Sequence, residues 1–105
     1  MEFVVHALDK PNTQEQRLEF LDRHREFLET GPEKFGVSVL MSGPLNSDCG
    51  TIMIGSFFLL AAETRNQVEA MFAADPLASA NVWERLDISR VTIRQNNIGP
   101  IPNNA

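Results

Sequence analysis

The feature that most constrains the fold is a long apolar segment, TIMIGSFFLLAA, at residues 51–62. Its β-branched and aromatic residues predict a strand, and because apolar residues do not alternate with polar ones, both faces of that strand need a cover. Helices of the same chain can cover one face. The other face is then free to contact a second molecule, which predicts a homodimer in which sheet packs on sheet.

The length of the chain limits the number of domains that it can form. With 105 residues and 43% hydrophobic residues, it is long enough for one domain with its own core, and a site in so small a domain is shallow or is completed by a second subunit. We predict a single domain at residues 1–95. Residues 96–105 have no hydrophobic period and are predicted to be a C-terminal tail.

Hydrophobic periodicity and turn residues predict a strand, a helix, two strands, a helix and a strand, in that order. We expect them at residues 3–8, 13–30, 35–42, 51–62, 64–74 and 83–94. Gly31-Pro32 is expected to stop the first helix, and Gly43-Pro44 to close the second strand. Capping boxes pair residues three apart at both helix starts: Asn12 with Glu15 or Thr13 with Gln16, and Thr64 with Gln67.

The order β-α-β-β-α-β defines the fold class. It is typical of an α+β, ferredoxin-like domain, in which two helices cover one face of a four-stranded antiparallel sheet.

Charge and cysteine content exclude several classes of function. The net charge is −5 and the pI is about 4.9, which oppose binding to nucleic acid or to an anionic membrane surface. The single cysteine, Cys49, cannot form an internal disulfide, and the start of the chain, MEFVVHALDK, resembles neither a signal peptide nor a spanning helix. We therefore expect a cytoplasmic protein.

Two polar residues occupy the apolar stripe of the predicted first helix. At about 100° per residue, Arg17 and His24 lie in the middle of the side that carries Phe20, Leu21 and Leu28. A buried imidazole or guanidinium needs a carboxylate or carbonyl partner. His24 is therefore either a satisfied core histidine, a side chain that reaches outward from a slightly rotated helix, or a functional residue.

Asp75 is the carboxylate best placed to be that partner, because it ends the second helix and the two helices are neighbours in this topology. A carboxylate bonded to one imidazole nitrogen fixes the tautomer and leaves the other nitrogen free to move a proton. The simpler interpretation of Asp75-Pro76 is a helix terminator or turn.

Two further residues are candidates for substrate binding. His6 shares a face of the first strand with Val4 and Leu8 and either lines a cleft or is a half-exposed strand residue. Ser56, with Gly55, could offer a hydroxyl and backbone N–H groups to an oxyanion, although a strand glycine explains that pair equally well. Neither nucleotide-binding nor metal-binding motifs are present, so no cofactor and no metal is expected.

Several short motifs occur in an order that is specific in combination: Asp9-Lys10, Arg17-Leu18 followed by His24, Gly43-Pro44-Leu45, Gly50 with Gly55-Ser56, and Asp75-Pro76. On these motifs the chain resembles the YciI-like proteins, which are dimeric α+β barrel proteins of ferredoxin-like fold. The resemblance runs nearly end to end. It implies that His24 and Asp75 form a catalytic dyad.

The resemblance implies less about the reaction, because most members have no assigned activity, while one branch removes chloride from a chlorinated hydroxyquinol. The chain departs from the family pattern after Pro76, where Leu-Ala-Ser-Ala-Asn follows, and in its Asn- and Pro-rich tail. These segments are expected to border the cleft, so substrate identity does not carry over.

The leading hypothesis is a cofactor-independent lyase or isomerase that acts on a small organic molecule. His24, oriented by Asp75, would transfer a proton, and Arg17 would hold an anionic group. One alternative is a non-catalytic ligand-binding or assembly domain in which these residues form a buried polar network. Another is a cofactor-free monooxygenase, which would need a cavity lined by His6, Phe57 and Trp83.

Overall fold

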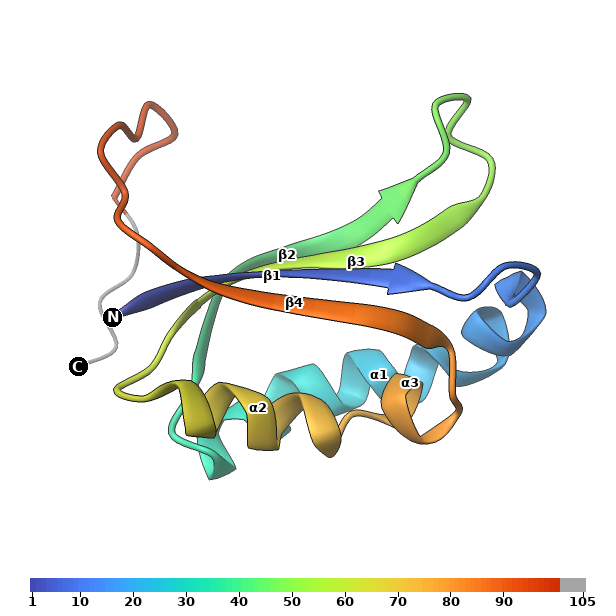
Figure 1. Ribbon diagram of the computed structural model, residues 1–105, viewed down its shortest axis with the longest axis horizontal. Helices are drawn as coiled ribbons and strands as arrows, with labels where there is room; N and C mark the ends of the chain where they lie inside the picture. The colour runs from blue at the N-terminus through green and yellow to red at the C-terminus, as the bar shows by residue number, and fades with distance from the viewer. Residues whose placement is uncertain (101–105) are drawn as a thin grey trace.

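The computed structural model describes residues 1–100, and the chain forms an antiparallel sheet with helices on one side of it (Figure 1). The elements are β1 Glu2–Asp9, α1 Gln14–Lys34, β2 Ser38–Asn46, β3 Met53–Ala61, α2 Arg65–Ala73, α3 Pro76–Ser79 and β4 Trp83–Val91. The strand order is β2-β3-β1-β4, and every neighbouring pair is antiparallel. The predicted ferredoxin-like α+β fold is confirmed.

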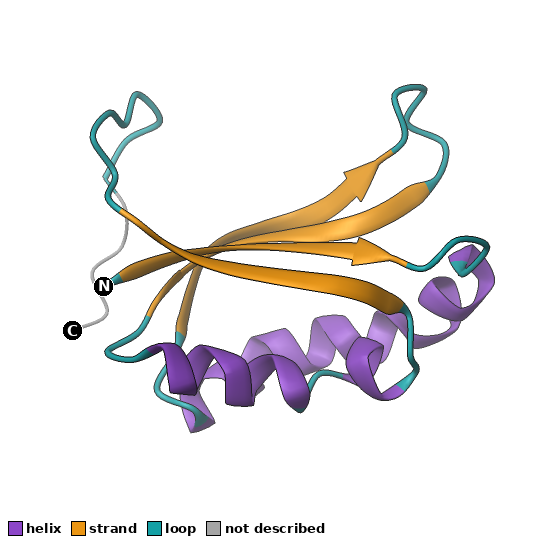
Figure 2. Cartoon of the chain, viewed as in Figure 1, coloured by secondary structure: helices purple, strands orange, loops and turns teal. Residues whose placement is uncertain are grey.

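The core lies between the sheet and the helices, which all lie on the same side of it (Figure 2). Phe3, Val5, Ala7 and Asp9 of β1 are buried, whereas His6 and Leu8, which alternate with the last three, are exposed. This alternation places every second residue of β1 on the helix side. The helix-facing surface of the sheet is therefore the one that can build a site together with α1.

The first helix is longer than expected. We predicted that Gly31-Pro32 would end it after Thr30, but α1 continues to Lys34 and the left-handed residue Gly36, with φ 74°, follows it. Gly31 is buried within α1. A Cβ there would lie 2.5 Å from the Phe27 ring, so only glycine lets that ring pack on the helix. Packing therefore outweighs the helix-breaking tendency of the pair.

One of the predicted helix caps is present and the other is not. Thr64 accepts a hydrogen bond from the backbone N–H of Gln67, whose side chain in turn accepts from the N–H of Thr64, so this capping box is confirmed. Thr13 precedes α1 without capping it, because its hydroxyl donates to the Lys10 carbonyl at 2.6 Å instead. The capping box predicted for the first helix is wrong.

The edges of the sheet also differ from the prediction. Strand β2 runs through Gly43-Pro44 to Asn46, because β2 is an edge strand, where a proline removes no ladder hydrogen bond that the sheet needs. β3 begins at Met53, two residues later than predicted, and β4 ends at Val91, three residues earlier than predicted. The short helix α3 forms where an irregular segment was expected.

The sheet face opposite the helices has no cover in residues 1–100. We call it the open face; it includes Val4, His6 and Leu8 of β1, Met41 of β2 and Phe57 of β3. The hairpin between β2 and β3 and the segment after β4 both project to this side (Figure 2). Residues 92–100 contain no helix or strand, and the rest of the predicted tail, 101–105, lies outside the described residues.

Among the described residues, no helix combines the length and the hydropathy that a bilayer crossing requires.

Candidate active site

Arg17 and His24 lie seven residues apart on the same face of α1, and that face is turned toward the sheet. Arg17 is 1% exposed and His24 is 6% exposed, so the predicted placement of both in the apolar stripe is confirmed. A charged or titratable group at such depth needs partners. Each of the two has a carboxylate partner, and the two carboxylates come from different elements.

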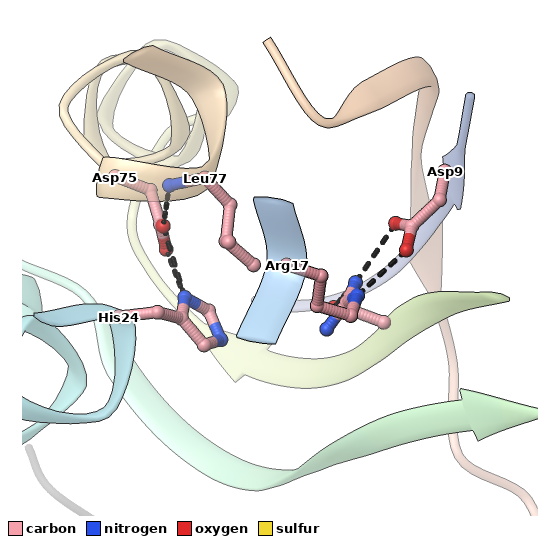
Figure 3. A network of polar contacts seen from close by, with 6 residues as sticks. Asp9, Arg17, His24, Asp75 and Leu77 are labelled. Atoms are coloured by element: carbon pink, nitrogen blue, oxygen red, sulfur yellow. Dashed lines mark hydrogen bonds and ion pairs between the residues drawn. The ribbon is translucent and has the colours of Figure 1, made fainter. Parts of the chain in front are cut away.

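The partner of His24 is Asp75. The ring nitrogen Nδ1 lies 2.8 Å from Oδ2 and 2.9 Å from Oδ1 of the fully buried carboxylate (Figure 3). Asp75 is also the N-cap of α3, where Oδ1 accepts the backbone N–H of Leu77 at 2.8 Å and Pro76 begins the helix. The cap holds the carboxylate in place before any substrate arrives.

This contact fixes how the imidazole is protonated. An ionised carboxylate only accepts hydrogen bonds, so His24 Nδ1 carries the hydrogen and donates it to Asp75. The other ring nitrogen, Nε2, has no hydrogen-bond partner within residues 1–100 and is not one of the fully buried unpaired atoms. In the neutral ring Nε2 therefore holds a lone pair that can accept a proton.

Two aromatic rings hold the imidazole in orientation. The Phe58 ring lies edge-on to it at a centroid distance of 6.2 Å and an angle of 81°. Trp83 does the same at 6.3 Å and 88°. The ring of His24 is thus held by a carboxylate on one side and by aromatic rings from β3 and β4.

The partner of Arg17 is Asp9, at the end of β1. Nε donates to Oδ2 at 2.6 Å and Nη2 donates to Oδ1 at 2.8 Å, which makes a bidentate pair. Nη2 also donates to the hydroxyl of Ser56 at 2.8 Å. The third nitrogen, Nη1, has no hydrogen bond to the part of the chain that the structure describes, and it is not fully buried.

Sequence reasoning missed Asp9 as the partner of Arg17, because it predicts that the first strand ends at residue 8, one position before Asp9. The strand instead continues through Asp9, which is buried on the same face as Val5 and Ala7. A signal was available. Continuing the two-residue alternation of β1 by one step places this carboxylate on the helix side.

A pocket of about 220 Å³ lies between α1 and the strands β2 and β3. It is small beside the usual range of about 300–1,000 Å³ for ligand pockets. Its walls combine basic, hydroxyl and apolar groups: Arg17, Leu21, His24, Arg25, Leu28, Ser42, Gly43, Pro44, Met53, Ser56 and Phe58. Three of the predicted site residues, Arg17, His24 and Ser56, thus meet at one pocket, and Asp75 supports it from behind His24.

His6 is not part of this site. It lies opposite Phe57 in the sheet register, whereas its neighbour Ala7 lies opposite Ser56. Successive strand residues point to opposite faces, so His6 and Phe57 lie on the open face, and Ser56 faces the helices. The structure therefore does not place His6 at this pocket, and substrate binding by His6 stays a prediction.

The three side chains that would line a monooxygenase cavity are divided between the two faces of the sheet. Trp83 packs against the core on the helix side, where its ring meets His24 and Phe72. His6 and Phe57 lie on the other face of the sheet.

Ionisable groups elsewhere add little to this site. Within residues 1–100, no group of three or more His, Cys, Asp or Glu side chains is arranged to hold a metal ion. Cys49 is exposed in the hairpin between β2 and β3, where hydrogen bonds from the hydroxyls of Ser47 and Thr51 lower its pKa from the ordinary 9.0 to about 7. It does not line the pocket.

The fold and site together define a ferredoxin-like α+β domain with a buried histidine–aspartate pair beside a small pocket. A family model for the YCII-related domain matches residues 1–92. The chain therefore belongs to the YCII-related family. No curated protein sequence matches it.

Solved structures extend the comparison. The chain is similar to 5-chloro-2-hydroxyhydroquinone dehydrochlorinase (TftG) from Burkholderia phenoliruptrix AC1100 in complex with 2,5-dihydroxybenzoquinone, with a TM-score of 0.72 and 25% identity over 88% of this chain and 94% of that one. It shares its fold with At3g17210 from Arabidopsis thaliana, with a TM-score of 0.50 and 12% identity over 92% and 98% of the two chains.

Proposed function

We propose that this protein is a cofactor-independent lyase or isomerase that transfers a proton on a small organic molecule. The observation that carries the proposal is the state of His24, a residue that lines the pocket: its Nδ1 is bonded to buried Asp75, and its Nε2 has no hydrogen-bond partner among residues 1–100. A base held in one tautomer with its lone pair toward a pocket is the arrangement that general base catalysis requires.

The roles of the two residues differ. His24 Nε2 takes a proton from the substrate and becomes an imidazolium, and Asp75 positions the ring and stabilises the charge that forms. In an elimination, the electron pair released by the lost proton forms the new double bond, and the leaving group departs as an anion with its own bonding pair. In an isomerisation, the imidazolium returns the proton to another carbon. Neither step needs an oxidant or a reductant.

Arg17 and Ser56 are proposed to position a substrate oxygen. The Ser56 hydroxyl accepts a hydrogen bond from Arg17 Nη2, which leaves its own hydrogen to be donated into the pocket. Arg17 Nη1 offers a second N–H. The bidentate contact with Asp9 immobilises Arg17, and Arg17 in turn holds the Ser56 hydroxyl, so both groups are preorganised for an oxygen that gains negative charge.

The first compounds to test are selected from the similarity to a dehydrochlorinase. The protein is assayed against chlorinated and unchlorinated hydroquinones, with chloride release and the ultraviolet spectrum as readouts, and binding of 2,5-dihydroxybenzoquinone is measured by calorimetry. We expect at least one hydroquinone to be converted, and conversion to require His24. Conversion that is unchanged in His24→Asn contradicts the proposal, and so does the absence of turnover across the panel.

A second candidate is a non-catalytic ligand-binding or assembly domain. It is favoured by the polar contacts between elements, which could serve stability alone. Arg17 connects α1 to β1 and β3, and His24 connects α1 to the N-cap of α3. In that case substitution of either residue lowers stability and changes no rate. A variant that keeps the wild-type melting temperature and loses turnover decides for the enzyme.

We also propose that two copies associate through the open face. This face presents Leu8 and Met41, which are 36% and 39% exposed, next to Phe57 and His6. An apolar sheet face of this kind is typical of an interface. Light scattering at micromolar concentration should give twice the mass of 11.7 kDa, and Met41→Glu should reduce it; a monomeric wild-type protein contradicts the proposal.

The proposed location is a reducing compartment, the cytoplasm. Its support is Cys49, which is a free thiol exposed on a hairpin and has no second cysteine in the chain to pair with.

A further inference from the structure

The pocket beside His24 has an unusual charge for this protein. The chain as a whole has 14 acidic and 9 basic residues, yet the ionisable side chains that line the pocket are Arg17, His24 and Arg25, all of them basic. A recess lined by one sign of charge raises the local concentration of ligands of the opposite sign. The pocket therefore favours an anion although the protein is acidic.

Two of the three basic groups are already compensated. Arg17 is paired with Asp9, and His24 is paired with Asp75. Arg25 has no ion pair and no side-chain hydrogen bond with any residue in the described range 1–100. Its acidic neighbours one turn away, Asp22 and Glu29, do not pair with it either. Within the described residues, Arg25 is thus a cationic group of the pocket that has no carboxylate partner.

The position of Arg25 suits a residue that meets the ligand at the entrance. It follows Leu21 by four positions and precedes Leu28 by three, so it shares the pocket-facing side of α1 with them. Unlike Arg17 and His24, it is exposed. The interior wall beyond it is largely apolar and includes Met53 and Phe58.

We infer that the substrate is a small ring compound with a carboxylate or an ionised hydroxyl, and that Arg25 binds this anionic group and selects it over a neutral one. The inference rests on the proposed function and adds the substrate class to it. The apolar wall contacts the ring, and the planar guanidinium donates to the anionic group, to both oxygens in the case of a carboxylate. Arg17 and Ser56 remain free to orient the oxygen nearer to His24.

The test compares two ligands of nearly the same shape, 2,5-dihydroxybenzoate and the neutral 2,5-dihydroxybenzamide, by titration calorimetry. Wild-type protein should bind the benzoate about tenfold more tightly, a difference of about 1.4 kcal/mol. Arg25→Met should remove this preference and leave the affinity for the amide unchanged. Arg25→Lys, which keeps the charge and loses the fork, should retain part of it.

The matched control is Arg23→Met. Arg23 lies on the same helix and is exposed, but it sits over the Phe20 ring at 5.1 Å and does not line the pocket. Its replacement should leave both affinities unchanged. The inference is overturned if wild-type protein binds the two compounds equally or binds neither, if Arg25→Met keeps the preference, or if Arg23→Met removes it as well.

The outcome separates this inference from the proposed function. Once a substrate is known, Arg25→Met should raise KM for anionic substrates with kcat nearly unchanged, because its contact is the same in the ground state and the transition state. His24→Asn should lower kcat and leave the benzoate preference intact. If only the rise in KM of Arg25→Met is not observed, the inference about Arg25 is contradicted. If only the fall in kcat of His24→Asn is not observed, proton transfer by His24 is contradicted.

Discussion

The two buried ion pairs of α1 are built from similar groups but are used differently. Arg17 and Asp9 are 1% and 4% exposed at their side chains, and two guanidinium nitrogens meet both carboxylate oxygens. His24, which lines the pocket, meets Asp75 through one ring nitrogen only, and the other nitrogen has no partner in the described part of the chain. We call Arg17–Asp9 the saturated pair, because most of its polar atoms are hydrogen-bonded within the pair, and such a pair holds elements together. We call His24–Asp75 the half-used pair, because one ring nitrogen stays available for proton transfer.

The largest effect is expected at the half-used pair. His24→Asn keeps a side-chain N–H that can donate to Asp75 but removes the ring nitrogen that accepts a proton. We expect turnover to fall by about 10²–10⁴-fold, with the fold preserved. Steady-state kinetics on a substrate from the hydroquinone panel measure the loss, and circular dichroism checks the fold. If His24→Asn is inactive because it is unfolded, the His24–Asp75 pair has a structural role like that of Arg17–Asp9, and the prediction is contradicted.

The saturated pair should carry the largest change in stability. Asp9→Ala leaves the Arg17 guanidinium buried without its carboxylate, which costs about 3–5 kcal/mol in free energy of unfolding. Urea denaturation measures the change. Its control is Asp87→Ala, which removes the exposed pair with Arg85 and should stay within about 0.5 kcal/mol of wild type.

A double variant sharpens this prediction. Replacing both members, as Asp9→Leu with Arg17→Met, removes the unpaired charge and should recover much of the stability that Asp9→Ala loses. It should also weaken substrate binding, because the N–H groups that Arg17 presents at the pocket are lost. Equal destabilisation by Asp9→Ala and by the double variant would show that packing, and not the unpaired charge, is the cause.

Asp75→Asn should have a smaller effect on stability than Asp9→Ala. The amide oxygen can still cap α3 by accepting from Leu77, so we expect a loss of about 1–2 kcal/mol. The amide N–H₂ then faces His24 Nδ1 and favours the tautomer with the hydrogen on Nε2, which cannot accept a proton. Turnover should fall by about 10²-fold, at the lower end of the range for His24→Asn. Wild-type kcat in this variant would show that the tautomer does not matter.

The smallest effect on the fold is expected at Cys49, whose hydrogen bonds, unlike those of the buried pairs, are exposed. Its pKa of about 7 means that the thiolate forms as pH rises through neutrality, so alkylation by iodoacetamide should be half-maximal near pH 7. Thr51→Val removes the hydroxyl at 3.0 Å and should move this midpoint to higher pH without changing the melting temperature. A midpoint that stays in place would show that Thr51 does not stabilise the thiolate.

The contrast between the pairs also shows how far sequence reasoning reached. The 3.6-residue period of α1 was enough to place Arg17 and His24 among core residues, because that period is a local property of the helix. Asp75 could be named from the topology and the family resemblance. Asp9 was not named, because turn residues follow it and hide where the strand ends, although the two-residue alternation of β1 puts it on the same face as Val5 and Ala7.

His6 shows the complementary limit. Its alternation with Val5 and Ala7 separated it from them correctly, since strand periodicity is local. Which of the two faces the helices would cover depends on how α1 and α2 pack across the sheet, and the sequence pattern of β1 does not contain that choice. The structure places the helices against Val5 and Ala7, and His6 is therefore remote from the pocket.

The sequence by itself determined the order of elements, the fold class and the presence of two polar residues in an apolar stripe, because each follows from local periodicity or from motif order. The tertiary structure decided which carboxylate meets which basic side chain, that Arg17 and Ser56 share a pocket with His24, and that Arg25 has no ion pair among residues 1–100. These contacts join residues far apart in the chain, up to 51 positions for His24 and Asp75, so only the packed fold defines them.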